Sequence, residues 1–214
     1  MTLFSLKIIA IITMFLDHYY VIIGGPKLLN ILGRLSFPIF AFSISEGYSH
    51  TKDLKKYIMR LLSFAVIIQI PNFFGLQEYP LNIFFTLFMG LFCLMILDNN
   101  RLNIIIRYII VIYLCYISEK LGLDYGAYGV LLIIMFHKFR NIKKSLFIVF
   151  LILNIVFITI GSLSEVQMYS IFSLIPIFLY NGDKGYSMKY FFYLFYPLHF
   201  IFIYILNYLI GRTK

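Results

Sequence analysis

Residues 6–23 read LKIIAIITMFLDHYYVII and decide the fold, because this apolar run approaches the length of a helix that crosses a bilayer. Two adjacent ionisable residues, Asp17 and His18, stand inside it. A charged side chain at mid-bilayer depth costs roughly 2.5 to 3.5 kcal/mol, so such residues normally face a protein interior or a water-filled cavity. The run therefore predicts a membrane helix that carries a functional site at Asp17 and His18.

The composition of the whole chain agrees with this prediction. Hydrophobic residues make up 62% and charged residues 13% of the sequence, and the mean hydropathy is +0.91. In soluble domains, roughly 45–50% of residues are hydrophobic and about 25% are charged. Apolar runs recur along the whole chain, which predicts one all-α, polytopic transmembrane bundle over residues 1–214 rather than a barrel.

Nine helical segments are expected, with a range of eight to ten, and the shorter ones are expected to be tilted or broken. Basic residues in short loops gather on one side, which predicts a cytoplasmic N-terminus in a multi-pass plasma (inner) membrane protein. The net charge of +9 is scattered over these loops and does not indicate nucleic-acid binding. The segments are 4–23, 28–49, 57–75, 81–98, 102–118, 125–139, 145–163, 167–180 and 188–210.

Lys7 precedes a hydrophobic run as in a signal peptide, but no small-residue cleavage pattern follows it, so we expect this run to be the first span. Cys93 and Cys115 lie in apolar segments without metal-type spacing. We expect both to be small buried hydrophobes.

A rise of about 1.5 Å per residue places four polar residues from three segments at one depth. They are Asp17, His18, Arg34 and His199. Here His18 would accept a proton from an amine or hydroxyl, and the Asp17 carboxylate would fix the histidine tautomer or pair with Arg34. The alternative is a packing Asp–Arg pair with a bystander histidine.

Two prolines stand near this level. Pro38 lies in GRLSFPIFAFSISEG at 33–47 and is expected to kink or break its helix about one turn beyond Arg34. The irregular backbone is either an ordinary proline kink or part of the lining of a cavity. In YLFYPLHFIFI, Pro197 accompanies Tyr196 and His199.

A second polar level is expected near the cytoplasmic face. Glu46 and Arg60 flank the TKDLKK turn, and His50 lies between them in the sequence. Glu46 and Arg60 form either a salt bridge that closes a helical hairpin or part of a binding site. At the outer mouth, Asp124 serves as a helix N-cap or as a substrate contact. Gln69, Asn72 and Asn82 are polar residues in or near spans, and we expect them to hold helices together.

Several stretches together resemble the TraX family of integral membrane proteins, named for the conjugal F-type pilin acetylase. They are LKIIAIITMFLDHYY, GRLSFPIFAFSISEGYSHT, YIMRLL followed by Gln69 and Pro71, DYGAYGV, YNGDKG and FYLFYPLHF. The motif residues that match are Asp17 and His18 as the DH pair, Arg34 as the GR arginine, Glu46 as the EG glutamate, Arg60 as the RL arginine, Asp124 as the DYG aspartate and His199 as the YPxH histidine.

The resemblance implies acetyl or other acyl transfer from a coenzyme A donor, such as acetyl-CoA, to an amine or hydroxyl acceptor at the membrane. In the family's named member the acceptor is the N-terminal amine of pilin. In the expected mechanism His18 is the general base or is transiently acylated, Asp17 orients it, and Arg34 or His199 steadies the oxyanion. The donor's nucleotide end is expected at a cytoplasmic set of residues, and the acceptor at an outer set. The first set is Arg60, Glu46, Lys52, Lys55 and Lys56, and the second is Asp124, Tyr125 and Tyr196.

Two other classes of function stay open. Intramembrane Asp and His also suit a proton-coupled transporter, and the chain could be a non-catalytic assembly partner of a secretion or conjugation system. The expected partners are membrane lipid and a small-molecule or peptide acceptor, with a homo-oligomer left open and no nucleic acid or metal.

Overall fold

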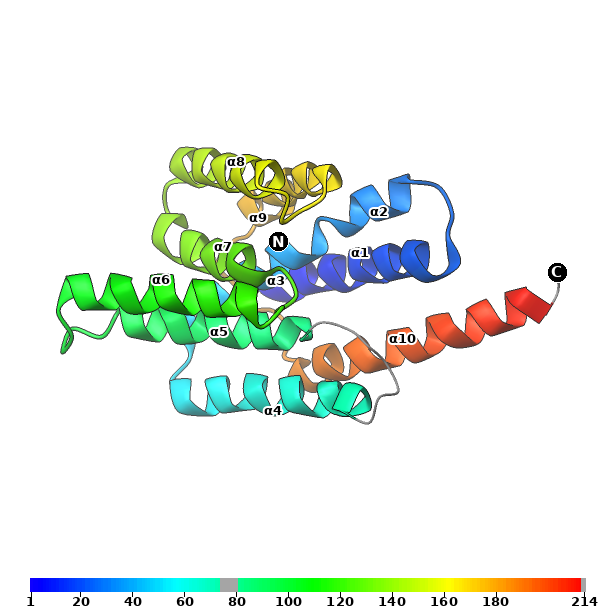
Figure 1. Ribbon diagram of the computed structural model, residues 1–214, viewed down its shortest axis with the longest axis horizontal. Helices are drawn as coiled ribbons and strands as arrows, with labels where there is room; N and C mark the ends of the chain where they lie inside the picture. The colour runs from blue at the N-terminus through cyan, green and yellow to red at the C-terminus, as the bar shows by residue number, and fades with distance from the viewer. Residues whose placement is uncertain (74–80, 213–214) are drawn as a thin grey trace. The chain divides into compact units, whose positions relative to one another are not determined.

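The computed structural model describes residues 1–73 and 81–212, and these residues are helical with no strand among them (Figure 1). The all-α prediction is confirmed. The predicted end of the third segment at residue 75 lies outside the described residues. The elements are α1 (Leu3–Ile23), α2 (Leu28–Gly33), α3 (Ser36–His50), α4 (Leu54–Phe73), α5 (Ile83–Leu97), α6 (Ile104–Lys120), α7 (Gly126–Phe139), α8 (Lys143–Thr159), the 3₁₀ helix η1 (Glu165–Ser173), α9 (Leu174–Phe178) and α10 (Lys189–Arg212).

The predicted second segment is broken into α2 and α3 at Arg34 and Leu35. The break lies one turn before Pro38, not one turn beyond Arg34 as predicted. Pro38 has no N–H to donate to the carbonyl of Arg34, and its ring would clash with that carbonyl in a continuous helix. The chain instead tightens, and the Leu35 N–H donates to the Leu32 carbonyl three residues back at 3.2 Å.

The predicted segment at 167–180 consists of η1 followed by the short α9, so the expected irregularity is present. Nine residues make η1 long for a 3₁₀ helix, in which residues three apart lie on one line. Gln167, Ser170 and Ser173 follow this spacing and are all buried. The Ser170 hydroxyl contacts Asn154 Oδ1 of α8 at 3.2 Å, so this polar line faces protein.

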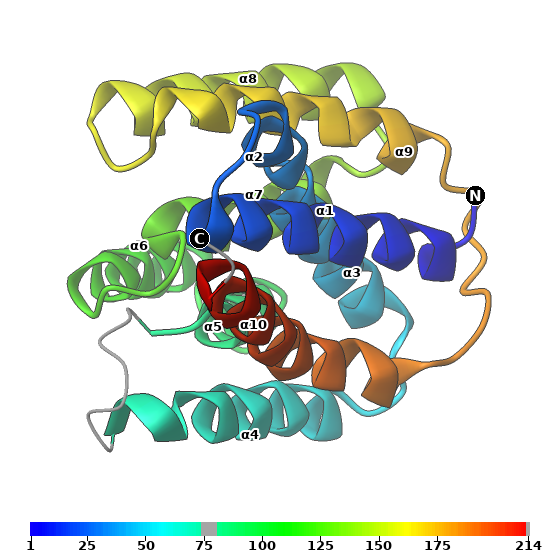
Figure 2. The ribbon, with the colours of Figure 1, turned by 90° about the vertical axis from the view of Figure 1, so that its right-hand side faces the viewer.

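The chain divides into two compact units. The first comprises residues 1–43 and 154–214, and within it α1 lies between α2 and α10 (Figure 2). Aromatic and cation–π contacts join α1 to α10, because the Phe15 and Phe202 rings lie 6.1 Å apart and Lys7 Nζ lies 5.6 Å from the Phe192 ring. Packing of α1 on both neighbours allows adjacent α1 residues to meet different helices.

The loop before α10 satisfies the N-terminus of α1. The first N–H groups of a helix have no partner within it. Here the Leu3 N–H donates to the Asp183 carbonyl at 2.8 Å, and the Phe4 N–H donates to the Lys184 carbonyl at 3.1 Å. The amino group of Met1 donates to the Leu179 carbonyl at 2.8 Å. The loop that precedes α10 is therefore bound to the start of α1.

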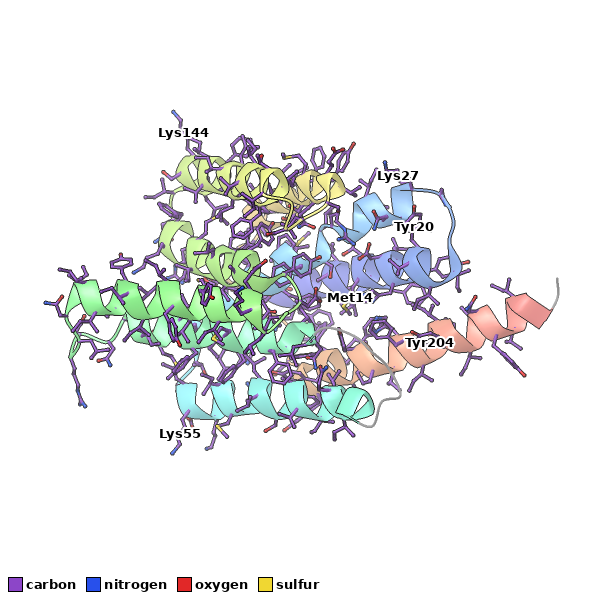
Figure 3. All side chains as sticks on the ribbon, viewed as in Figure 1. Met14, Tyr20, Lys27, Lys55, Lys144 and Tyr204 are labelled. Atoms are coloured by element: carbon purple, nitrogen blue, oxygen red, sulfur yellow. The ribbon has the colours of Figure 1, made fainter. Side chains whose placement is uncertain are left out.

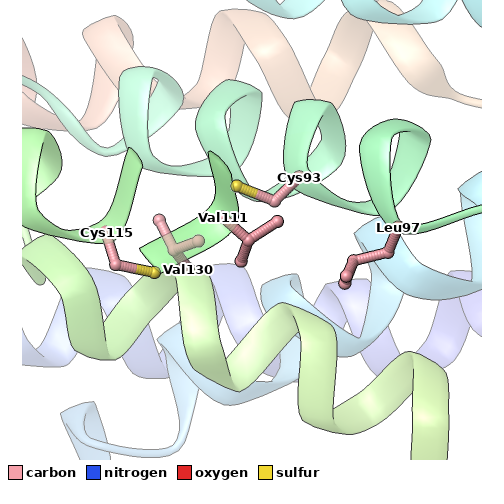
Figure 4. Packing of buried hydrophobic residues seen from close by; sticks show 5 residues of the cluster. All are labelled: Cys93, Leu97, Val111, Cys115 and Val130. Atoms are coloured by element: carbon pink, nitrogen blue, oxygen red, sulfur yellow. The ribbon is translucent and has the colours of Figure 1, made fainter. Parts of the chain in front are cut away.

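The second unit comprises residues 44–153, in which α5 packs against α4, α6 and α7. The side chains of Gln69 and Asn82 hydrogen-bond at 2.8 Å between α4 and the start of α5, as predicted for polar residues that hold helices together. Cys93 and Cys115 are free and buried, as predicted. They pack with apolar residues of the same helices and of α7 (Figure 4), namely Leu97, Val111 and Val130.

Three stretches of the described chain are long and apolar enough to cross a membrane. They are Leu3–Ile23, Leu28–His50, which includes the break, and Tyr190–Gly211. These are the stretches that carry Asp17, His18, Arg34 and His199. Shorter apolar helices occur at Ile83–Leu97, Gly126–Phe139 and Glu165–Phe178.

Candidate functional site

Asp17 and His18 contact different helices. Adjacent residues of an α-helix are rotated by about 100°, so they cannot point in one direction. Asp17 contacts residues of α2 and of the break that follows it, whereas His18 contacts α10. The first unit thereby brings together the four polar residues that the sequence placed at one depth.

The Asp17 carboxylate holds the chain at the break. Its Oδ2 accepts a hydrogen bond from Arg34 Nη2, and its Oδ1 accepts one from Asn30 Nδ2 at 2.8 Å. Arg34 Nε also donates to the Asn30 carbonyl at 3.4 Å. The side chains of Asp17 and Arg34 are 13% and 16% exposed, so their charges neutralise each other in a largely buried place.

Gly33 permits this close approach of α2 to α1. A Cβ at Gly33 would lie 2.6 Å from Asp17 Cγ and would overlap Asp17 Cβ as well. Any larger residue would have to move the carboxylate away from Arg34 and Asn30.

His18 pairs with His199. His18 Nδ1 lies 2.6 Å from His199 Nε2, and the two ring centroids are 4.9 Å apart. The Phe200 ring stacks on the His18 ring with centroids 4.5 Å apart. The His18 side chain is partly exposed, whereas His199 is only 3% exposed.

His199 is held by its own helix. Its Nδ1 bonds to the Phe195 carbonyl at 2.9 Å, and the Phe195 ring is nearly parallel to the imidazole at 5.2 Å. Tyr196, predicted as a substrate contact, presents its ring edge to His199 at 5.6 Å. The imidazole of His199 is thus fixed in position by contacts on several sides.

These contacts bear on the roles that were predicted for the four residues. Asp17 pairs with Arg34, which was one of the two alternatives, and does not orient His18. The residue that contacts His18 Nδ1 is His199. Arg34 or His199 was expected to steady an oxyanion; both take part in the contacts described here, and that role stays a prediction.

The sequence analysis missed Asn30 and Gly33. Asn30 stands four residues before Arg34, which places both on one face of a helical turn. A polar side chain at that spacing from an arginine within an apolar stretch is a usable signal. Gly33 gives no comparable signal, because the need for a small residue there depends on the packing of α2 on α1.

The residues of the predicted cytoplasmic level lie in the second unit. Glu46 pairs with Arg140 at 3.4 Å, whereas a pair with Arg60 was one of the two alternatives. Glu46 also lies 3.7 Å from His50 Nδ1. Arg60 instead lies over the Tyr57 ring at 5.4 Å. Hydropathy cannot predict the Glu46–Arg140 pair, because the two residues are 94 positions apart.

The TKDLKK turn presents basic groups at the start of α4. Lys52, Lys55 and Lys56 are exposed, and Figure 3 shows the Lys55 side chain extending away from α4. Asp53 Oδ1 accepts a hydrogen bond from the Lys56 N–H at 2.9 Å, and this bond lowers the pKa of Asp53. Asp53 also lies 3.3 Å from Lys56 Nζ.

Asp124 and Tyr125 form the turn between α6 and α7 in the second unit. The N-cap of α7 is Tyr125, which has a φ of 61°, so the predicted N-cap at Asp124 is off by one residue. The Asp124 carbonyl accepts a hydrogen bond from Thr86, and its N–H donates to the Leu81 carbonyl at 2.8 Å. Glu119 caps α7 by accepting from the Ala127 N–H at 3.0 Å.

Another polar cluster in the second unit was not predicted. Asp98 Oδ2 accepts a hydrogen bond from the Tyr48 hydroxyl at 2.9 Å and lies 3.3 Å from His137 Nε2. Lys138 Nζ lies 3.8 Å from Asp98 Oδ1. These residues come from α3, α7 and the end of α5, so no local motif indicates the cluster. Within the described ranges, no group of three or more His, Cys, Asp and Glu side chains could hold a metal ion.

Comparisons with known proteins agree over nearly the whole chain. The family model of the TraX protein matches residues 3–207. A protein of Dichelobacter nodosus, described as "Probable fimbrial assembly protein FimC, serogroup H1", is 30% identical over 226 residues, which cover 92% of this chain and 91% of that protein. No solved structure matches the chain. Because the family model matches nearly the whole chain, the chain belongs to the TraX family.

Proposed function

We propose that this protein is a membrane-embedded acyltransferase that moves an acyl group, in the simplest case acetyl, from cytosolic acyl-CoA to an amine or hydroxyl acceptor at the outer side of the membrane. A peptide or fimbrial N-terminus is the proposed type of acceptor. The proposed topology is the nine-segment arrangement with a cytoplasmic N-terminus in the plasma (inner) membrane.

One observation carries the proposal. A histidine pair and a neutralised carboxylate–guanidinium pair meet within the three stretches that are apolar enough to cross a membrane. Ionisable groups are costly in that setting, and their presence favours a functional role. Imidazole is the side chain best suited to accept and return a proton near neutral pH.

The proposed reaction is balanced without further reagents. The acceptor nitrogen or oxygen bonds to the thioester carbonyl carbon, and the carbon–sulfur bond breaks. The acceptor's proton passes to His18 and from there to the departing coenzyme A thiolate. The products are an amide or ester and the free thiol.

The phosphates of the donor require cations on the cytosolic side. The exposed Lys52, Lys55 and Lys56, together with Arg60, are proposed to attract the nucleotide end of acyl-CoA. The Glu46–Arg140 pair would then stabilise the end of α3 next to this turn and would not contact the phosphates directly.

The test is acyl transfer by the protein purified in detergent, with no membrane gradient. Release of thiol from acetyl-CoA and mass spectrometry of an added peptide with a free N-terminus report the reaction. His18→Ala is expected to lower the rate by about 10²- to 10⁴-fold, which is the usual contribution of a general base. His50→Ala is the matched control, because its side chain is 65% exposed and belongs to the second unit. Wild-type rates in His18→Ala would refute the proposal.

A second candidate is a non-catalytic role in fimbrial assembly, which the description of the Dichelobacter nodosus relative favours. Cells carrying His18→Ala separate the two. A non-catalytic assembly protein would still support normal fimbriae in these cells, provided that the variant is present at the wild-type level. The acyltransferase proposal expects fimbriae or other acceptors that lack the acyl group.

A further inference from the structure

We propose that His199 is a positioning residue that keeps the proton of His18 on Nδ1 and so makes Nε2 of His18 the nitrogen that reacts. This inference rests on the proposed acyl transfer for its functional consequence. The assignment of the proton rests on hydrogen-bond geometry and on the burial of His199.

The assignment begins at the Phe195 carbonyl. A carbonyl oxygen only accepts hydrogen bonds, so the His199 nitrogen 2.9 Å away, Nδ1, must carry a proton. A neutral imidazole has one protonated nitrogen, which leaves Nε2 of His199 as an acceptor. His18 Nδ1 lies 2.6 Å from this Nε2 and must therefore donate. Neutral His18 then has its lone pair on Nε2.

The opposite arrangement requires a charged His199. An imidazolium at His199 would donate to His18 Nδ1 and leave the His18 proton on Nε2. His199 is 3% exposed, and the Asp17 carboxylate is bound to Arg34 and Asn30. A buried charge without a counter-ion is strongly disfavoured, and no described carboxylate pairs with His199, so neutral His199 is the expected state.

His199 cannot rotate easily to release this hydrogen bond. The Phe195 ring lies parallel to its imidazole, and the Tyr196 ring meets it edge-on. A rotation would break the bonds to Phe195 and to His18 together. His199 is therefore suited to fix the tautomer of its partner.

Nε2 of His18 is available to a substrate. Among the described residues, no side chain donates a hydrogen bond to it, and the His18 side chain is partly exposed. Phe200 covers a face of the ring and leaves the ring edge, where the nitrogens lie. The reacting proton would thus arrive at Nε2 and not at Nδ1.

The neutral partner also affects the return of the proton. When Nε2 takes a proton from the acceptor, the Nδ1 proton stays hydrogen-bonded to His199, and both nitrogens of His18 are protonated. Within the part of the chain that the structure describes, no carboxylate contacts this imidazolium, because Asp17 is bound to Arg34 and Asn30. It therefore gives the proton readily to the leaving thiolate.

The test is nitrogen NMR of the full-length protein in detergent, labelled with ¹⁵N in its histidine rings. The chain has four histidines, so single substitutions at His50, His137 and His199 assign three of them, and the remaining signals belong to His18. The wild-type protein is expected to show His18 protonated at Nδ1 and unprotonated at Nε2. A wild-type His18 that carries its proton on Nε2 overturns the inference, whatever the activity.

Two variants connect the tautomer to the reaction. His199→Phe keeps an aromatic ring but removes the acceptor, so the His18 proton is expected to move to Nε2 and the turnover rate to fall about 10²-fold, with the KM for the donor unchanged. His199→Gln keeps an acceptor oxygen at a similar distance along the side chain and is expected to restore the Nδ1 tautomer and part of the rate.

The outcomes separate the two proposals. The inference is wrong if the His18 tautomer in His199→Phe equals that of the wild type. It is also wrong if His199→Gln and His199→Phe have the same His18 tautomer and the same turnover rate. Circular dichroism must show that both variants are folded. NMR is recorded without donor or acceptor. Absence of acyl transfer in every protein, including the wild type, therefore refutes the proposed function and leaves the tautomer assignment to be decided by the spectra.

Discussion

The replacement Gly33→Ala is predicted to push α2 away from Asp17. The new Cβ would stand 2.5 Å from Asp17 Oδ1 and 2.6 Å from Asp17 Cγ, whereas ordinary van der Waals contact starts at 3.4 Å. The carboxylate cannot swing aside, because the Asp17 Cβ is also in the way. The helices must therefore separate by about 1 Å, because the new Cβ would stand closest to Asp17 Cβ and ordinary contact starts at 3.4 Å.

This separation acts on the polar contacts of Asp17. A 2.8 Å hydrogen bond to Asn30 that lengthens by this amount is no longer a hydrogen bond, and the Arg34 contact is strained with it. Overpacking of a well-packed site usually costs about 1–3 kcal/mol. For a chain of this size, each kcal/mol lowers the melting temperature by about 2–4 °C. The expected loss is therefore about 2–12 °C.

The measurement is thermal unfolding in detergent, followed by circular dichroism at the helical band. Gly211→Ala is the matched control, because Gly211 is also helical and its Cβ would meet nothing within 4 Å. The control is expected to keep or slightly raise the melting temperature, since Ala is the better helix former. Equal melting temperatures for the two variants would show that Asp17 and Gly33 are not in close contact.

Two further predictions concern the first unit. Asp17→Asn leaves the largely buried Arg34 guanidinium without its carboxylate and is expected to destabilise the protein by about 3–5 kcal/mol. The same substitution is expected to cost less in a protein that already carries Arg34→Met. If the two substitutions have additive effects on thermal unfolding, the two side chains are not paired. Gly185→Ala is expected to cost about 1–3 kcal/mol more than Gly182→Ala, because both glycines have positive φ but only a Cβ at Gly185 meets Thr2, at 2.6 Å from its Oγ1. Equal melting temperatures of these two variants would exclude tight packing of the loop on α1.

The helices were predictable because long apolar runs and the residues between them are local properties. The predicted segment 125–139 corresponds to α7 at Gly126–Phe139, and 4–23 corresponds to α1 at Leu3–Ile23. The break before Pro38 was predicted in kind and misplaced by about a turn. The missing N–H of a proline acts on the carbonyl four residues earlier, so its effect appears upstream of the proline itself.

The meeting of Asp17, His18, Arg34 and His199 was also predictable, from depth along each helix. Depth depends only on the rise per residue and on where each helix begins. It indicates that side chains lie at one level and does not indicate which of them touch. The Asp17–Arg34 and His18–His199 contacts are two of several pairings that the same depths allow.

The amino-acid sequence by itself determined the helical class, the apolar stretches and the set of polar residues within the first unit. Only the tertiary structure decided that Asp17 contacts Arg34 and Asn30 while His18 contacts His199. The physical reason is the rotation of about 100° between neighbouring helix positions, whose effect depends on which helices lie on either side of α1. Packing of α2 on one side and α10 on the other assigns the carboxylate to one pair and the imidazole to another.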